Sequence, residues 1–294
     1  MSPAPFADRL VALVEERQSQ LCLGLDPDPS RLDPRSAAAE GSAAERAAGA
    51  VAAHCRSLIG AAGPACVAAK LQLACFERLG APGWAALERT VAAARDAGLV
   101  VIADGKRGDV PVSAAAYAQA LFGSTPTPWG DVAGLGADAA TVSPLVGGDS
   151  LEPLLDGAAE ANAGLFVLVR TSNPGAADLL DLPAPEAPLF ERLAALVAER
   201  ADRLMGDSGL SGMGAVVGAT EPRHLSRLRE LMPRAIFLVP GLGAQGGRAA
   251  DLGPAFGEHP ASALVTASRS IADASDPAAA AGELRAELWA LAGG

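Results

Sequence analysis

The chain has 294 residues, of which 50% are hydrophobic and 19% charged, so it is long enough for one large barrel or two ordinary domains. Its formal net charge of −11 argues against nucleic acid or an anionic membrane as the main partner. The N-terminus lacks the basic and apolar regions of a signal peptide, and no apolar run reaches the roughly 18 residues of a membrane span. We therefore expect a cytoplasmic protein.

The cysteines and histidines indicate neither a disulfide framework nor a metal site. They have no spacing typical of zinc ligands or of a redox pair. The sequence predicts buried, reduced thiols and no bound metal. The residues concerned are Cys22, Cys55, Cys66, Cys75, His54, His224 and His259.

Apolar strand-like runs alternate with helical stretches after an N-terminal helix expected over 5–17. The strand-like runs are 21–26, 66–72, 99–102, 138–143, 164–170, 213–218, 235–240 and 263–267. The helical stretches between and after them are 42–59, 83–97, 112–122, 150–162, 189–204, 221–231 and 277–291. No linker divides the chain, so the pattern predicts a single (β/α)8 TIM barrel over residues 1–294. A doubly wound sheet fits less well, because it needs fewer strands and a glycine-rich loop after the first one.

Two connections depart from this regular pattern. Residues 123–137 form an irregular stretch rich in Gly, Pro and Thr, which is long for a connection between a helix and a strand. Residues 171–188 contain four prolines and begin with polar side chains. We expect the second of these loops to fold over a site.

The third predicted strand runs directly into charged residues. Side chains alternate along a strand, so Asp104 and Lys106 point the same way, towards the axis of a closed barrel. Asp109 follows just beyond the strand. Charges at the mouth of an apolar strand are costly to desolvate, which favours a functional role. The alternative is a strand that ends at the surface, with both aspartates as ordinary loop and helix-cap residues.

Polar side chains also follow the other predicted strands, where active sites of such barrels lie. Lys70 is a lone ammonium within an apolar strand, although a lysine reaching solvent from a strand edge is an alternative. Asp26 is open to a second interpretation, as a cap or turn residue before Pro27. The strand ends together supply Asp26, Lys70, Asp104, Lys106, Ser143, Ser172, Thr220, Gln245 and Arg269.

The last two strands are followed by features typical of a phosphate site. Residues 240–247 are glycine-rich, and the final strand ends in Ser268-Arg269-Ser270. Loops after strands seven and eight of these barrels commonly bind phosphate through backbone N–H groups. Arg269 can add a bidentate pair with the phosphate oxygens. A flexible glycine-rich connection is the alternative for residues 240–247 alone.

With these residues placed, the chain resembles the orotidine 5′-phosphate decarboxylase family. The run 104–111, Asp-Gly-Lys-Arg-Gly-Asp-Val-Pro, is similar to that family's D-x-K-x-x-D-[IV]-P signature. Residues 239–247 and 268–271 resemble its phosphate loop and final strand end, and residues 141–153 resemble its longer bacterial and mycobacterial subgroup. Gly105 and Ser113 depart from the more common Ala and Thr. Both changes are tolerable, because Ser113 keeps the hydroxyl and Gly105 faces away from the charged pair.

The resemblance implies a homodimeric, cofactor-free enzyme that converts orotidine 5′-phosphate to UMP and CO2. It implies an alternating catalytic array of Lys70, Asp104, Lys106 and Asp109, with Asp109 and Ser113 contributed across the dimer interface. By the same resemblance, Asp26, Lys70, Asp109 and Ser113 hold the ribose hydroxyls. Ser172 contacts the pyrimidine amide, and Gln245, Gly247 and Arg269 lie at the phosphate. Lys106 is implied as the proton donor.

Two other functions remain open at this stage. A magnesium-dependent sugar-phosphate decarboxylase or aldolase uses a similar D-x-K-x-x-D, but Lys70 occupies a strand end where a metal ligand would be useful. A non-catalytic barrel that binds a phosphate ligand is the second alternative. Loss of catalysis is expected to damage the charged array before the fold, and the array is intact.

Overall fold

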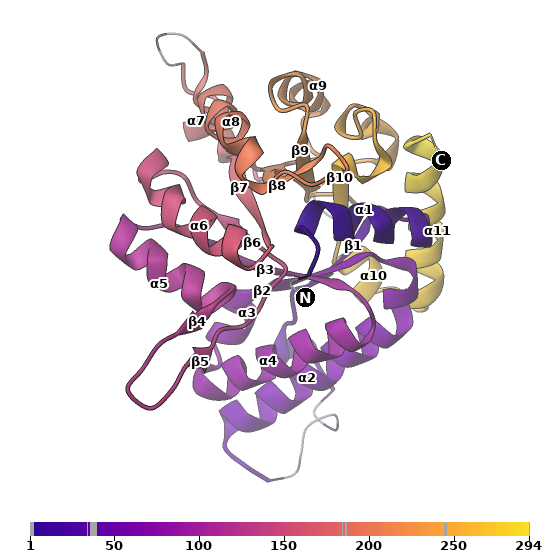
Figure 1. The fold of residues 1–294 in the computed structure, drawn as a ribbon. Coiled ribbons are helices and arrows are strands. Elements are labelled where there is room, and N and C mark those ends of the chain that lie inside the picture. The colour runs from indigo at the N-terminus through magenta and orange to yellow at the C-terminus, as the bar shows by residue number, and fades with distance from the viewer. Residues whose placement is uncertain are drawn as a thin grey trace.

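Eight parallel strands close into one barrel in a computed structural model that describes residues 3–33, 35, 40–183, 185, 187–243 and 246–293. Around the barrel the strands follow the order β1-β10-β9-β8-β7-β6-β3-β2, which is the chain order except for a separate two-stranded hairpin (Figure 1). The barrel strands are β1 (Leu21–Leu25), β2 (Ala68–Gln72), β3 (Val100–Arg107), β6 (Ala139–Val142), β7 (Gly164–Arg170), β8 (Ser211–Val217), β9 (Ala235–Val239) and β10 (Ala263–Ala267). The predicted (β/α)8 barrel is thus confirmed.

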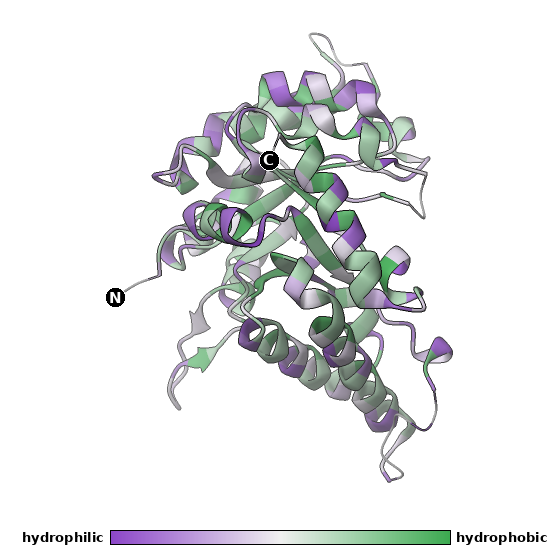
Figure 2. Ribbon diagram, turned by 90° about the vertical axis from the view of Figure 1, so that its right-hand side faces the viewer, coloured by the Kyte–Doolittle hydropathy of each residue, from purple (hydrophilic) through white to green (hydrophobic). Residues whose placement is uncertain are grey.

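Helices surround the strands and connect them. They are α1 (Phe6–Arg17), α2 (Ala43–Ala62), α3 (Leu73–Glu77), α4 (Gly80–Asp96), α5 (Pro111–Leu121), α6 (Glu152–Glu160), α7 (Ala176–Leu180), α8 (Leu189–Arg200), α9 (Pro222–Leu231), α10 (Arg269–Ala272) and α11 (Pro277–Leu291). In Figure 2 the strands and the inner sides of the helices are hydrophobic, while hydrophilic residues lie on the outer sides. In the described part of the chain, no helix combines the length and the apolar character that a membrane span requires.

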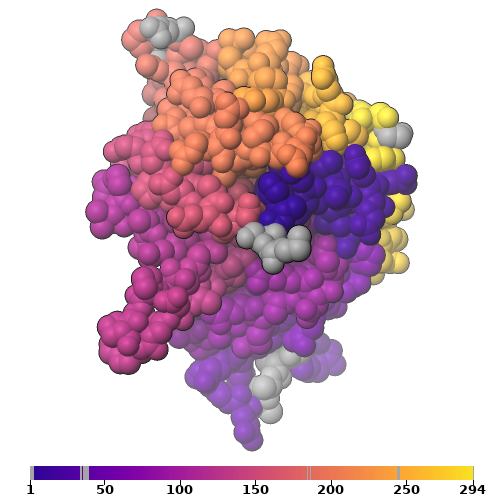
Figure 3. Space-filling view, viewed as in Figure 1, coloured from indigo at the N-terminus to yellow at the C-terminus, as the bar shows by residue number. Residues whose placement is uncertain are grey.

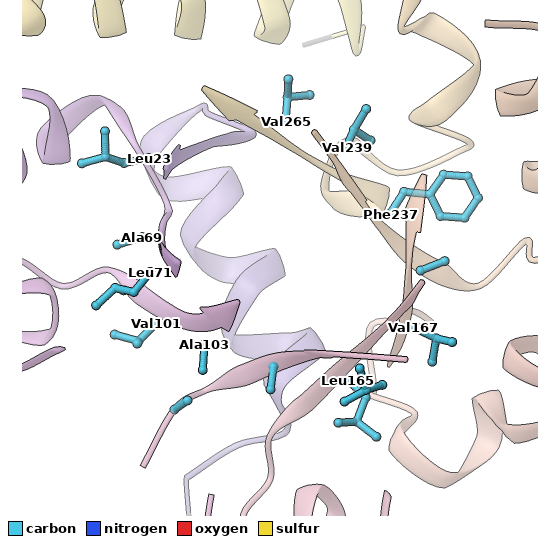
Figure 4. Packing of buried hydrophobic residues seen from close by; sticks show 14 of the residues in the cluster. Leu23, Ala69, Leu71, Val101, Ala103, Leu165, Val167, Phe237, Val239 and Val265 are labelled. Atoms are coloured by element: carbon cyan, nitrogen blue, oxygen red, sulfur yellow. The ribbon is translucent and has the colours of Figure 1, made fainter. Parts of the chain in front are cut away.

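The core forms two layers because successive side chains of a strand point in opposite directions. Leu23 and Val101 belong to the outer layer, in which the strands pack against the surrounding helices (Figure 4). Cys22 and Ile102 belong to the inner layer, which fills the barrel together with α1. The residues at the inner positions of each strand end therefore converge on the barrel axis.

Helix α1 covers the N-terminal end of the barrel, where its buried side chains pack with inner side chains of the strands, and Figure 3 shows it in indigo to the right of the centre of that face. Phe6 is buried and packs edge-on against Phe166 of β7, with ring centroids 5.9 Å apart. Arg9 pairs with Asp138, just before β6, at 2.5 Å between Nη1 and Oδ1. Since the barrel strands are parallel, their polar C-terminal ends all lie at the other end of the barrel, which we call its mouth.

The two irregular connections contain secondary structure that the sequence pattern did not predict. Residues 123–137 carry an antiparallel hairpin of β4 (Ser124–Thr125) and β5 (Val132–Ala133), which projects from the body next to α5 (Figure 1). Gly134 lets this hairpin approach α5, since a Cβ there would lie 2.3 Å from the carbonyl oxygen of Gln119. The second connection, residues 171–188, contains the short helix α7.

Candidate active site

The charged end of β3 is a bulge. Strand β3 pairs with β6 in regular register up to Ala103, and the register shifts before pairing resumes at Arg107. Lys106, within the bulge, has a backbone φ of +49°, a left-handed conformation that costs a non-glycine residue about 1–3 kcal/mol. The side chain of Arg107 turns outward to an ion pair with Glu77. The bulge therefore aims Lys106, and not its neighbour, into the mouth of the barrel.

Asp104 is the centre of the site and is buried. Its Oδ1 accepts hydrogen bonds from Lys106 Nζ at 2.6 Å and Thr141 Oγ1 at 2.7 Å. Its Oδ2 accepts from Lys70 Nζ at 2.5 Å and Gln72 Nε2 at 3.2 Å. Burial opposes ionisation, but the two ammonium groups outweigh it and hold the pKa of Asp104 well below its usual value. The carboxylate is thus ionised and held by two lysines.

Lys70 lies between two carboxylates. Its side chain is buried, 2.5 Å from Asp104 and 3.7 Å from Oδ1 of Asp26. Burial disfavours the ammonium form, yet the charges of Asp104 and Asp26 prevail and raise the pKa of Lys70. Lys70 is therefore buried inside the barrel mouth and does not reach solvent from a strand edge.

These groups line a cavity of about 350 Å³ at the mouth. Its volume falls in the range of small-molecule sites, roughly 300–1,000 Å³. An apolar part of the wall consists of Leu168, Val216 and Leu238. Six of the ten site residues that the family resemblance implies line this cavity, namely Asp26, Lys70, Asp104, Lys106, Ser172 and Arg269.

The other predicted residues do not line this cavity or fall outside the described residues. Asp109 accepts a hydrogen bond from the N–H of Val110, and Ser113 lies in the first turn of α5. Gly247 is buried in the loop after β9, and its N–H donates to the carbonyl of Gly241 at 3.1 Å. Gln245 lies outside the described residues, so its predicted place at the phosphate stays a prediction.

Five further polar residues of the cavity wall were not predicted as site residues: Gln72, Thr141, Thr171, Asn173 and Thr266. Strand alternation would have indicated Gln72, which follows Lys70 by two residues and therefore faces the same way. Thr141 belongs to an otherwise apolar strand, where a β-branched residue is unremarkable. Thr171 and Asn173 belong to the polar start of residues 171–188, the loop expected to fold over a site, whereas Thr266 carried no such signal.

Ser172 is held in place by the segment that follows β8. The hydroxyl of Thr220 donates to the carbonyl of Ser172 at 3.1 Å, and Gly218 lies so close that a Cβ there would be 2.6 Å from the Cα of Ser172. Beside it, buried Arg170 forms a bidentate pair with Asp181 at 2.7 and 3.0 Å. The beginning of this connection is therefore tied to the segment after β8 and, through Arg170, to Asp181 at the end of α7.

The fold and this mouth define a (β/α)8 barrel with a lysine–carboxylate array at the ends of its strands. The model of the orotidine 5′-phosphate decarboxylase / HUMPS family matches residues 19–284, and the chain belongs to this family. It is 41% identical over 273 residues to an orotidine 5′-phosphate decarboxylase from Rhodopirellula baltica, covering 90% of this chain and 87% of that one. A Deinococcus radiodurans protein of the same name is 40% identical, with 92% and 90% covered.

Solved structures show the same likeness. The structure of Leishmania donovani OMP decarboxylase superposes with a TM-score of 0.77 at 34% identity, covering 99% of this chain and 100% of that chain. A Methanocaldococcus jannaschii orotidine 5′-monophosphate decarboxylase in complex with the inhibitor BMP is 20% identical with a TM-score of 0.64, a likeness of fold.

Proposed function

We propose that this protein decarboxylates orotidine 5′-phosphate to UMP and CO2 without a cofactor, the last step of de novo UMP synthesis. The observation that carries the proposal is the ionised carboxylate of Asp104 held between two ammonium groups at the mouth of the barrel. The family and the names of the relatives support the same reaction.

The chemistry requires a fixed positive charge beside the reacting carbon. When the bond from C6 of the pyrimidine to the carboxylate breaks, its electron pair stays on C6 and CO2 leaves. Lys106 is 43% exposed at its side chain and lines the cavity, so its ammonium can stabilise this charge and then give a proton to C6. The lysine regains its proton from water, and the product is UMP.

Asp104 keeps the lysines in place for this step. It is ionised and paired with both before substrate binds, so the positive charges need little rearrangement during the reaction. Its carboxylate would lie against the departing carboxylate of the substrate. Asp104 thus both orients Lys106 and places negative charge next to the group that leaves.

The rest of the substrate is held at a distance from the reacting carbon. We place the phosphate at Arg269, Gly247 and Gln245, the pyrimidine amide at Ser172, and ribose hydroxyls at Asp26 and Lys70. Arg269 is the first residue of α10 and lines the cavity. It is exposed, so its guanidinium group is accessible to an anionic ligand. Binding energy from the phosphate can then assist the chemical step at C6.

We propose further that two copies form a two-fold dimer in which each supplies Asp109 and Ser113 to the other's site. Neither residue lines the cavity of its own chain. Beside them Val110 and Val112 are 51% and 85% exposed and offer apolar surface to a second copy. A second copy would cover them and bring Asp109 to the ribose.

A magnesium-dependent reaction of the same family fits the site less well. In the described residues, no three His, Cys, Asp or Glu side chains are placed to share a metal ion. At the mouth, Asp26 and Asp104 are both engaged by Lys70. A purely binding role is disfavoured because Lys70, Asp104 and Lys106 form a connected charged array at the mouth. We place the protein in the cytoplasm, where its four free thiols suit a reducing compartment.

Metal removal separates the two enzyme classes. We expect exhaustive EDTA treatment to leave the decarboxylation rate unchanged, and added Mg²⁺ not to raise it, because Lys106 and not a metal supplies the positive charge. The rate is followed by the ultraviolet absorbance of orotidine 5′-phosphate. Activity that disappears with EDTA and returns with Mg²⁺ would instead assign the protein to the metal-dependent enzymes.

A further inference from the structure

The hydroxyl group of Thr141 contacts both Asp104 and Lys106. Thr141, on β6, is 1% exposed. Its Oγ1 accepts a hydrogen bond from the backbone N–H of Lys106 at 3.0 Å and donates one to Oδ1 of Asp104 at 2.7 Å. The ionised carboxylate of Asp104 can only accept, so the single hydroxyl hydrogen of Thr141 is directed to it, and a lone pair of the same oxygen receives the N–H of Lys106.

The bulge in β3 explains why Lys106 needs this partner. Between Ala103 and Arg107 the ladder to β6 is interrupted, and it resumes where the N–H of Ser143 donates to the carbonyl of Arg107 at 2.7 Å. Inside the interruption the amide of Lys106 is bound by the Thr141 side chain instead. A half-buried N–H with no acceptor would be penalised, so the hydroxyl stabilises the bulge itself.

The same bond holds Lys106 in a conformation that lysine rarely adopts. Its φ of +49° persists only where the surroundings fix it. Oδ1 of Asp104, which binds Thr141, is also the oxygen that binds the Lys106 ammonium. Thr141 therefore fixes both the backbone of the lysine and the carboxylate to which its side chain is directed.

We propose that Thr141 is a positioning residue for Lys106, acting through its hydroxyl, a role that rests on the proposed function. It sets where the ammonium lies relative to the reacting carbon before substrate arrives. Loss of the hydroxyl leaves binding of the remote phosphate unchanged and misplaces the proton donor. We therefore expect loss of the hydroxyl to lower kcat and to leave the affinity for UMP nearly unchanged.

The test compares Thr141→Val, which removes the hydroxyl at nearly constant shape, with Thr141→Ser, which keeps it. We expect Val to lower kcat about tenfold to a hundredfold, the cost of a misplaced catalytic group, with KM and the Kd of UMP within about threefold of wild type. Ser restores most of kcat. If Val keeps near-normal kcat, or if Ser loses as much as Val, the proposal is wrong.

Thr90→Val is the matched control. Thr90 is also 1% exposed, but its hydroxyl donates to the carbonyl of Ala86 within α4, away from the cavity. We expect its kcat to match wild type, while thermal unfolding registers the lost hydrogen bond. If Thr90→Val lowers kcat as much as Thr141→Val does, the effect of Thr141→Val is general destabilisation and the proposal is wrong.

Amide hydrogen exchange, measured by NMR, tests the contact independently of any activity. The Lys106 amide is expected to be protected in the wild type and in Thr141→Ser, and to exchange faster in Thr141→Val, or in Thr141→Ala if Val does not fold. An unprotected Lys106 amide in the wild type would contradict the proposal even if the protein is active. A wild type that does not decarboxylate orotidine 5′-phosphate would overturn the proposed function, and the exchange result would still decide the contact.

Discussion

Lys106→Ala is expected to lower kcat by about 10³-fold or more, because the variant lacks both the charge that stabilises the carbanion and its proton donor. Asp104 keeps Lys70, Gln72 and Thr141 as partners, so the carboxylate stays satisfied and the fold persists. UMP has no carboxylate at C6, and its Kd is expected to stay within about threefold of wild type. The rate is measured by absorbance and the affinity by calorimetry.

Arg269→Ala is the control for this variant, because it is expected to affect chiefly the binding of UMP. Losing a charge-assisted phosphate contact is expected to weaken UMP binding by about 2–4 kcal/mol. Lys106→Ala with near-normal turnover would contradict the mechanism. Weak UMP binding in Lys106→Ala with normal binding in Arg269→Ala would show that the phosphate lies elsewhere in the cavity.

Mixing two inactive variants is expected to restore about a quarter of wild-type activity if Asp109 serves the partner subunit. Lys106→Ala and Asp109→Ala homodimers are each nearly inactive, because every site lacks one group. A heterodimer has one site with both defects and one intact site. Random pairing makes about half of the dimers heterodimers, and half of their sites are intact.

The mixture is prepared under conditions in which subunits exchange, and exchange is verified by mass spectrometry of differently tagged copies. If Asp109 acts within its own chain, every site keeps one defect and no activity returns. Absence of recovery after verified exchange would therefore refute the shared site while leaving the decarboxylation intact. Ser113→Ala mixed with Lys106→Ala provides a milder second test, in which shared sites raise the activity of the mixture above the average of the two homodimers.

The residues that the sequence predicted well belong to strands whose character changes abruptly. Around Lys70 and Asp104 an apolar run meets charge, and alternation alone places both side chains on the barrel axis. Their contact at 2.5 Å follows from the pairing of adjacent parallel strands, which the chain order already implied. Local pattern and global fold agree here, so the prediction succeeded.

What the sequence could not predict depends on contacts between distant segments. The bulge in β3 arises from its register against β6, so neither the left-handed backbone of Lys106 nor the role of Thr141 is visible in either strand alone. Strands β4 and β5 have two residues each, too few for any periodicity. Asp109 follows the bulge, where strand alternation no longer determines direction.

Incubation of the purified, EDTA-treated protein with orotidine 5′-phosphate tests the central claim most directly. The loss of substrate absorbance is followed together with chromatographic assay of UMP and capture of CO2. Because this account needs no metal or cofactor for decarboxylation and protonation at C6, we predict catalytic conversion to UMP and CO2 in equal amounts, with many turnovers per site. Unchanged substrate, with tight binding of UMP and no release of CO2, would contradict the account and indicate a barrel that only binds the nucleotide.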